Sequence, residues 1–109
     1  MPNTIDLTVE KGDGYAVIRT DGYINNIGGE QVADTCTALI DEGLHRLVLN
    51  LSKTNIVNSV GISILIEIIE QLEEAGGGLA FCGVTPTIAK TFQIMRLTDF
   101  AELYDSEAA

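Results

Sequence analysis

Residues 47–77 read LVLNLSKTNIVNSVGISILIEIIEQLEEAGG and join a strand-length apolar run to an amphipathic helix. The run Arg46–Leu51 is mostly apolar, which is typical of a central strand covered on both faces. We expect a short polar loop after it, and then a helix whose first turn contains Ser59. A helix start carries unpaired backbone N–H groups and a partial positive charge, so it would hold a phosphate placed on Ser59.

The helix after Ser59 has two distinct faces. Apolar side chains on one arc predict its buried face: Ile62, Leu65, Ile66, Ile69 and Leu72. Polar side chains on another arc should face water: Ser63, Glu67, Glu70 and Glu74. Ile64 and Ile68 lie off both arcs, so they either pack against a neighbouring helix or form part of a docking surface. The glycines 76–78 follow the helix and predict a flexible exit, not a phosphate-binding loop.

The residues before this stretch predict a hairpin and a helix. Residues 5–9 alternate between apolar and polar side chains, and the turn Gly12-Asp13-Gly14 precedes the extended run Tyr15–Arg19. Gly28 and Gly29 should loosen the chain before a helix over roughly residues 29–42, which ends at a glycine.

The residues after it predict a further strand and helix. Leu79–Val84 is an apolar run of strand length, and Thr85 followed by Pro86 is a strong helix start. The buried face of this helix should contain Ile88, Thr91, Phe92 and Met95. The last residues, 96–109, should add at most a short edge strand and a frayed turn.

Strands therefore alternate with helices after an opening hairpin, which predicts an α/β fold. We expect a sandwich with one mixed β-sheet of about four to five strands, helices packed on it and right-handed crossovers between parallel strands. With 109 residues, the chain is long enough for a single domain over residues 1–109 and too short for two.

The chain is strongly acidic, with a formal net charge of −10 and a pI near 4.2. Its few Lys and Arg residues form no cluster, so DNA or an anionic membrane would be repelled, and we expect no nucleic-acid partner. Such a domain can be steered towards a basic patch on another protein, although the same charge also serves simply to keep a protein in solution.

Three further features bear on the location of the protein. The longest apolar stretch, Ile62–Ile69, falls well short of the ~20 residues that a membrane span needs. The start, MPNTIDLTVEKGDG, has neither a basic leader nor an apolar signal core, so we expect a cytoplasmic protein. Cys36 and Cys82 lie in apolar periodic segments and should be reduced core thiols.

Residues 47–62, LVLNLSKTNIVNSVGI, closely resemble the strand, loop and helix start of anti-sigma-factor antagonists, the STAS domain family. The resemblance spans nearly the whole chain. It rests on the GYINN segment at 22–26, a turn at Asn50-Leu51-Ser52, Asn58-Ser59-Val60-Gly61 at the helix start, the glycine-rich exit and the acidic-Ala-Ala tail. Each motif alone is weak, but the set is fairly specific.

The resemblance implies a small antagonist that docks onto an anti-sigma factor with serine-kinase activity and frees a sigma factor. Phosphorylation of the serine that Ser59 matches would end this docking, and a serine phosphatase would restore it. The implied partner-binding residues are Asn25, Asn58, Ser59, Val60 and Gly61. The chain would then be a ligand and a substrate rather than an enzyme, and we expect a monomer or a weak dimer.

Three positions depart from the family pattern, because members commonly carry aspartate where this chain has Asn25, Asn50 and Asn58. Asparagine keeps the capping and hydrogen-bonding geometry but drops the charge. If the kinase reads those carboxylates, Ser59 would be phosphorylated slowly, by a diverged kinase, or not at all. The alternative function is therefore a non-phosphorylated STAS scaffold subunit of a signalling or lipid-transport assembly. Without the family resemblance, Ser59 would be interpreted as an ordinary helix cap.

Catalytic alternatives receive little support. Residues 57–61 imitate the nucleophile elbow G-x-S-x-G, but the first glycine is missing and the only histidine, His45, precedes the serine. One His and two separated Cys offer no metal-ligand spacing, and Gly12-x-Gly14 lacks the rest of a dinucleotide fingerprint. We therefore expect no metal and no cofactor.

Overall fold

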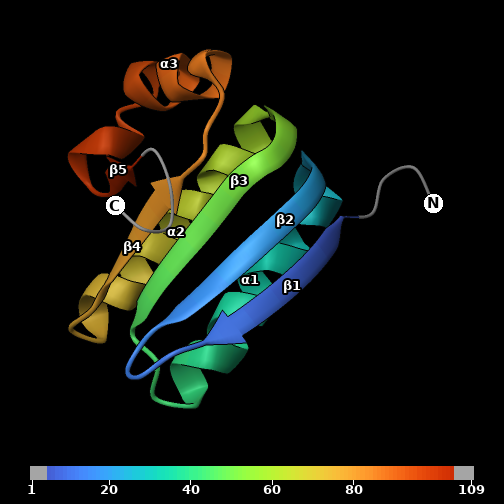
Figure 1. Cartoon of the computed structure of the whole chain (residues 1–109). Helices are drawn as coiled ribbons and strands as arrows, with labels where there is room; N and C mark the ends of the chain where they lie inside the picture. Colours follow the sequence, from blue (N-terminus) through green and yellow to red (C-terminus); the bar gives the residue numbers. More distant parts are fainter. Residues whose placement is uncertain (1–4, 105–109) are drawn as a thin grey trace.

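The computed structural model describes residues 5–104 and gives only the backbone of residues 55 and 56. Within this range strands and helices alternate after an initial pair of strands (Figure 1). In chain order the elements are β1 (Asp6–Lys11), β2 (Ala16–Ile24), α1 (Asn26–Asp41), β3 (Arg46–Val57), α2 (Ser59–Glu74), β4 (Gly78–Cys82), α3 (Pro86–Ile94), the 3₁₀ turn η1 (Leu97–Asp99) and β5 (Glu102–Tyr104).

The strands form one mixed sheet in the order β1-β2-β3-β4-β5, which confirms the predicted α/β fold. β1 and β2 are antiparallel and form the predicted hairpin, whereas the other neighbours are parallel. Helices α1 and α2 lie on the same face of the sheet (Figure 1). Because each follows one of two parallel neighbours, β2 and β3, both helices begin at the same end of the sheet.

The core lies between this sheet and the helices. Alternate residues of β3, namely Leu47, Leu49 and Leu51, are at most 2% exposed. Four members of the predicted apolar arc of α2 are buried with them and Ile66 is partly buried, which confirms that arc. Ile68 is also buried.

Ile64 packs against α1, since a Cβ on Gly29 would lie 2.8 Å from the Ile64 Cδ1. Ile64 therefore follows the neighbouring-helix alternative, and Ile68, which is 1% exposed, lies in the core rather than on a docking surface. At the other side of the core, the rings of Phe81 and Phe92 lie 5.0 Å apart and join β4 to α3.

Both central strands are longer than predicted. β2 continues past Arg19 to Ile24, and β3 continues past Leu51 to Val57, so the expected polar loop and the expected turn at residues 50–52 are wrong. The two strands keep pairing through two register shifts up to Ile24↔Val57.

A buried hydroxyl pair explains why this paired segment looks like a loop in the sequence. The side chains of Thr20 and Thr54 are at most 2% exposed, and their hydroxyls hydrogen-bond to each other at 2.5 Å. Thr20 and Thr54 are thus polar and yet interior, because their hydroxyls satisfy each other, whereas Ser52 and Lys53 of the same segment are exposed.

The predicted start of the first helix is also corrected. α1 begins at Asn26 rather than near residue 29, so Gly28 and Gly29 lie in its first turn and do not loosen the chain. In the exit after α2, Gly77 N donates to Leu72 O at 2.8 Å and Gly78 N donates to His45 O at 2.9 Å.

The C-terminal part follows the prediction with small changes. Thr85 caps α3 and accepts a hydrogen bond from Ile88 N at 3.2 Å, as expected from the Thr-Pro pair. β4 ends at Cys82 rather than at residue 84, and Met95 is not in the buried face, because it follows the last helical residue and is 43% exposed. The predicted edge strand is β5.

Cys36 and Cys82 are buried and unbridged, as predicted. None of the helices within residues 5–104 has the length and apolar character that a bilayer crossing requires. The acidic-Ala-Ala tail lies outside the described residues.

Candidate functional site

Ser59 is the first residue of α2, and its side chain is exposed. The capping role belongs to the residue before it, because Asn58 Oδ1 accepts a hydrogen bond from Gly61 N at 2.8 Å. An ordinary cap therefore does not describe Ser59. Its hydroxyl is not needed to complete the helix start and points to a surface that another molecule can reach.

The end of β2 fixes the position of this helix start. Asn58 N donates to Ile24 O at 3.1 Å, which ties the cap to the neighbouring strand. Gly61 is buried, and a Cβ there would lie 2.3 Å from the same carbonyl oxygen. Only glycine allows the backbone at position 61 to approach the Ile24 carbonyl so closely. Ser59 is therefore exposed on a helix start that is closely packed against β2.

The start of α1 lies directly beside it. Asn25 caps α1 and accepts a hydrogen bond from Gly28 N at 2.9 Å. A Cβ on Gly29 would lie 3.6 Å from the Gly61 Cα, so the two first turns are in contact. The structure thus brings the sequence-predicted residues Asn25 and 58–61 together at the carboxyl ends of β2 and β3.

Asn50 does not join this group. It lies within β3, is half-buried, and its Oδ1 accepts a hydrogen bond from Ser52 N at 3.0 Å. Eight residues of extended chain separate it from Asn58, or about 26 Å at the usual rise of a strand. The sequence pattern placed it in a turn, and the longer β3 removes it from the site.

Apolar side chains accompany Ser59 at this end of the sheet. Val60, which was predicted to bind a partner, is 49% exposed. Tyr23 and Ile27, which were not predicted, are 46% and 42% exposed. Exposed apolar side chains at a polar, rigid surface are typical of a protein-binding site. The missed signal is the similarity of residues 24–28, INNIG, to residues 57–61, VNSVG.

The electrostatics of the two helix starts favour an anion. Each helix N-terminus carries a partial positive charge, equivalent to about half an elementary charge. The first turns of α1 and α2 contain no acidic residue, although the chain as a whole has a net charge of −10. A phosphate on Ser59 would therefore meet backbone N–H groups and no carboxylate from either first turn.

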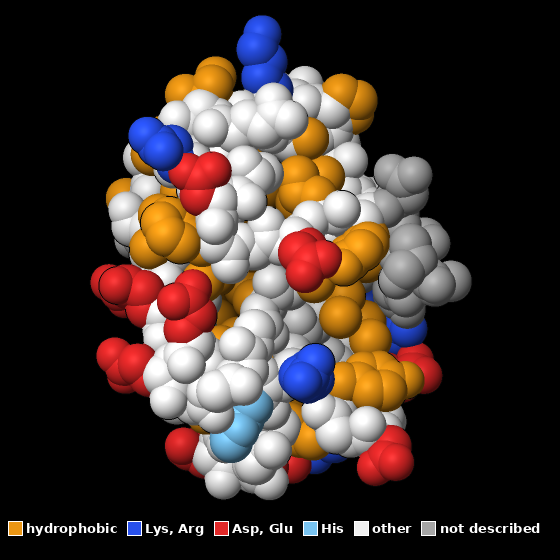
Figure 2. Space-filling model, turned by 90° about the vertical axis from the view of Figure 1, so that its left-hand side faces the viewer, with side chains coloured by type: hydrophobic (Ala, Val, Ile, Leu, Met, Phe, Trp, Pro, Cys, Tyr) orange, Lys and Arg blue, Asp and Glu red, His pale blue; other side chains and the backbone are white. Residues whose placement is uncertain are grey.

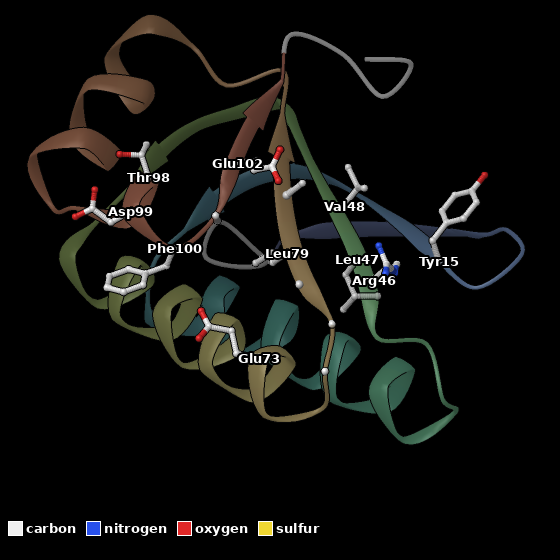
Figure 3. A pocket seen from close by; sticks show the side chains of 15 residues that line it. Tyr15, Arg46, Leu47, Val48, Glu73, Leu79, Thr98, Asp99, Phe100 and Glu102 are labelled. Carbon is white, nitrogen blue, oxygen red and sulfur yellow. The ribbon is translucent and has the colours of Figure 1, made fainter.

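A cavity among the described residues lies elsewhere. It has a volume of about 530 Å³ and lies between the first residues of β3 and β4, the glycines 76–78 and the segment before β5 (Figure 3). Val48, in its lining, is ten residues from Asn58, or about 30 Å along β3. Its lining contains no histidine or cysteine, and it is not part of the Ser59 site.

His45 is likewise remote from Ser59. The two residues flank opposite ends of β3, a continuous strand of 12 residues in a molecule whose longest extent is 31 Å. His45 therefore cannot act as the base of a hydrolytic serine, which would need hydrogen-bond contact. Within residues 5–104, no group of three or more His, Cys, Asp or Glu side chains could hold a metal ion.

Charged side chains are unevenly spread on the face shown in Figure 2. Acidic side chains gather along one side of this view, whereas Lys and Arg lie scattered without forming a cluster. The exposed row Glu67, Glu70 and Glu74 of α2 faces water as predicted.

Comparison with known proteins identifies a family and relatives that match most of the chain. The STAS domain profile matches residues 6–109. BtrV from Bordetella bronchiseptica, named as a candidate anti-sigma factor antagonist, is 30% identical over 88 residues, which cover 81% of this chain and 76% of BtrV.

Two solved structures are similar in fold. The crystal structure of an anti-sigma factor antagonist from Mycobacterium paratuberculosis matches with a TM-score of 0.85 and 24% identity, over 99% of this chain and 92% of that one. The Bacillus cell fate determinant SpoIIAA in its phosphorylated form matches with a TM-score of 0.73 and 21% identity, over 94% and 95% of the two chains.

Proposed function

This chain belongs to the STAS domain family, and we propose that it is an anti-sigma factor antagonist controlled by phosphorylation of Ser59. In this proposal residues 1–109 form one STAS domain that acts in the cytoplasm. The observation that carries the proposal is the exposed Ser59 hydroxyl in the first turn of α2, next to a second helix start and without an acidic residue in either first turn. Anti-sigma factor antagonists of the STAS family are binding proteins and not enzymes.

The partner would be an anti-sigma factor that is also a serine kinase. In the modification step the Ser59 Oγ bonds to the γ-phosphorus of ATP, the bond from that phosphorus to the bridging oxygen breaks, and ADP leaves. The hydroxyl proton passes to a base on the kinase. A serine phosphatase would later hydrolyse the phosphoserine and restore the hydroxyl.

Phosphorylation changes docking more than it changes the antagonist itself. A phosphoserine brings a charge of about −1.5 to −2 and three acceptor oxygens. The helix start offsets part of this charge locally, by about 0.3–1 kcal/mol at an exposed site. Burying the same group in a protein contact costs more, and each 1.4 kcal/mol of lost affinity is about tenfold, so docking fails.

The relatives support this proposal in two ways. BtrV carries the name of an anti-sigma factor antagonist, and it aligns with four-fifths of this chain. The similar fold of SpoIIAA has been solved in a phosphorylated form, so a fold of this kind accommodates a phosphate.

The proposal is tested by incubating the protein with each serine-kinase anti-sigma factor of the same genome and with ATP. Mass spectrometry should find one phosphate, located on Ser59, and none in Ser59→Ala. Ser63→Ala is the matched control, because Ser63 is also exposed and lies one helical turn further along α2. This control variant should be phosphorylated like the unaltered protein.

The two asparagine caps favour a second candidate function. Asn25 and Asn58 complete the helix starts without the charge that a kinase could read. A constitutive STAS scaffold in a signalling or lipid-transport assembly would use the same surface without modification. Stable docking to a partner, together with no phosphate on Ser59 from any of these kinases, would favour the scaffold and contradict the switch.

A further inference from the structure

The start of α2 has a counterpart in the same chain. Residues 24–28 read Ile-Asn-Asn-Ile-Gly and residues 57–61 read Val-Asn-Ser-Val-Gly. The two segments are also aligned in space, since Ile24 and Val57 are register partners on the parallel strands β2 and β3. Each position after them therefore has an equivalent on the neighbouring helix, and the equivalent of Ser59 is Asn26.

The local geometry of the two segments is nearly the same. Each asparagine caps its helix through one hydrogen bond to the backbone N–H of a glycine, at 2.9 Å for Gly28 and 2.8 Å for Gly61. Each glycine approaches a carbonyl oxygen at the end of β2, where a Cβ would lie 2.2 Å from Tyr23 O and 2.3 Å from Ile24 O. Gly28 approaches the strand that leads into its own helix and Gly61 the neighbouring strand, so a glycine seats both helices on the end of β2.

The two helix starts present two matched pairs of side chains to solvent. Asn26 and Ser59 are the first residues of their helices, and both are exposed. The following residues, Ile27 and Val60, are 42% and 49% exposed although both are β-branched and apolar. We call these four residues the paired helix starts.

The paired helix starts form one surface. The first turns touch at Gly29 and Gly61, which have no side chains to keep the helices apart. Packed helices lie about 8–10 Å apart, so a partner that covers Val60 also reaches Ile27. A typical protein contact buries about 800 Å² on each side and extends well beyond one helix turn.

We infer that the anti-sigma factor docks on both helix starts at once, with Asn26 and Ile27 as an unmodified, specificity-determining half and Ser59 and Val60 as the switched half. This inference rests on the proposed function. The occupant presents apolar side chains to Ile27 and Val60, which are exposed beside the polar Asn26 and Ser59. The surface of the occupant carries no basic group over the first turns, since the helix N-termini would repel it.

The first test measures affinity for the anti-sigma factor by titration calorimetry. Ile27→Ala should weaken binding of the unmodified protein by about tenfold, as should Val60→Ala, because each removes an anchor from the centre of the contact. Val9→Ala is the matched control, since Val9 is 40% exposed on the edge strand β1. The control should bind within about twofold of the unaltered protein.

The second test places a single negative charge on the unmodified half. Asn26→Asp keeps the size of the side chain and favours the helix start, so the melting temperature should be unchanged or higher. Its affinity should fall by about tenfold, because the charge is buried in the contact. Gln71→Glu is the control, since it adds the same charge about 18 Å further along α2 and should leave affinity unchanged.

The outcomes separate this inference from the proposed function. If Ile27→Ala and Asn26→Asp bind like their controls while Val60→Ala and phosphorylation weaken binding, the docking surface is α2 alone and the inference is wrong. If neither helix start affects binding and phosphorylation is also without effect, the proposed function is wrong and the inference falls with it.

Discussion

At the scale of single residues, the helix cap and the hydroxyl that can be modified belong to two different residues, Asn58 and Ser59. One serine at a helix start often provides both. The side-chain oxygen of Asn58 accepts the hydrogen bond from Gly61 N at 2.8 Å and so completes the first turn. The hydroxyl of Ser59 takes no part in that turn and is exposed. A change at Ser59 can therefore alter what the surface binds without removing the cap that holds the helix.

The charge at position 58 should control how well a phosphate is tolerated. Asn58→Asp keeps the cap, so the unmodified variant should melt close to the unaltered protein. After phosphorylation the variant should melt at a lower temperature than the phosphorylated unaltered protein. The reason is that its carboxylate and the phosphate repel each other by about 1 kcal/mol at short range in water. Thermal melts of both proteins, each with and without the phosphate, measure this difference. An equal or higher melting temperature of the phosphorylated variant would contradict the prediction.

The buried thiol of Cys36 gives stability a dependence on pH. Burial raises the pKa of Cys36 from 9.0 to about 12. Above pH 9 the thiol therefore ionises in the unfolded chain while it stays protonated in the folded one, and the unfolded state binds fewer protons. Its contribution to stability is fully present below pH 9 and declines as the pH rises towards 12, by about 1.4 kcal/mol per pH unit.

Urea unfolding at about pH 8 and about pH 10 tests this dependence. The unaltered protein should lose about 1.4 kcal/mol more stability between these values than Cys36→Ala does. The alanine variant is the control for every other group that titrates in this range. Equal losses in the two proteins would show that Cys36 does not titrate as its burial requires.

At the scale of the elements, contact between helix starts and strand ends positions the site. Gly61 lets α2 approach the carbonyl of Ile24, and this approach places Ser59 next to the start of α1. The corresponding contact of Gly28 with Tyr23 O positions α1. The helix starts are therefore fixed by backbone contacts, in which an added methyl group has no room.

Gly61→Ala should destabilise the protein by about 1–3 kcal/mol, because the new Cβ meets a backbone oxygen at 2.3 Å and neither group can turn away. Gly78→Ala is the matched control, since no atom lies within 4 Å of its would-be Cβ. That control should change stability by no more than about 0.5 kcal/mol. Urea unfolding midpoints of the two variants measure both effects. A loss in Gly78→Ala as large as in Gly61→Ala would show that the clash with Ile24 is not the cause.

The types of the elements could be predicted from the sequence, but the ends of the central strands could not. Periodicity identified the buried arc of α2, and the Thr85-Pro86 pair located the start of α3, because these signals lie within one segment. The ends of β2 and β3 depend on pairing between distant residues. Thr20 and Thr54 look like loop residues until their hydroxyls meet across the two strands.

The candidate site likewise has one part that could be predicted from a single segment and another part that depends on pairing between distant segments. Ser59 and its cap could be located from a single short motif. Tyr23 and Ile27 could not, because more than thirty residues separate them from Ser59 and only the parallel pairing of β2 and β3 brings them to the same end of the sheet. Gly29 was misread for the same reason, since its close contacts are with Ile64 and Gly61.

At the scale of the whole molecule, charge is distributed so that the acid-free helix starts stand out from an acidic protein. The net charge is −10, and the exposed side of α2 carries like charges one turn apart. Exposed ion pairs such as Lys11–Glu42, at 2.6 Å, compensate little of this repulsion. Self-repulsion should therefore lower the stability of the folded chain at low salt.

Salt should stabilise the protein. Raising NaCl from about 0.1 M to about 1 M shortens the Debye length from about 10 Å to about 3 Å, so the melting temperature should rise. The double variant Glu70→Gln, Glu74→Gln removes one pair of repelling carboxylates at i,i+4 spacing and should show a smaller rise. A melting temperature that falls with salt would mean that attractive ion pairs outweigh the repulsion.

The two ends of the sheet have different characters. The carboxyl ends of β2 and β3 present the exposed serine and apolar side chains, whereas the cavity of about 530 Å³ lies near the opposite end of β3. A partner seated at the helix starts would leave that cavity uncovered. The proposed function therefore depends on one end of the molecule and on the Ser59 hydroxyl.

The measurement that tests this most directly is a calorimetric titration of the anti-sigma factor with the protein before and after phosphorylation of Ser59. The account predicts that the phosphorylated protein binds at least about a hundredfold more weakly, which corresponds to about 2.8 kcal/mol. Treatment with a phosphatase should restore the original affinity. Equal affinities for the two forms, with the phosphate located on Ser59 by mass spectrometry, would contradict the account.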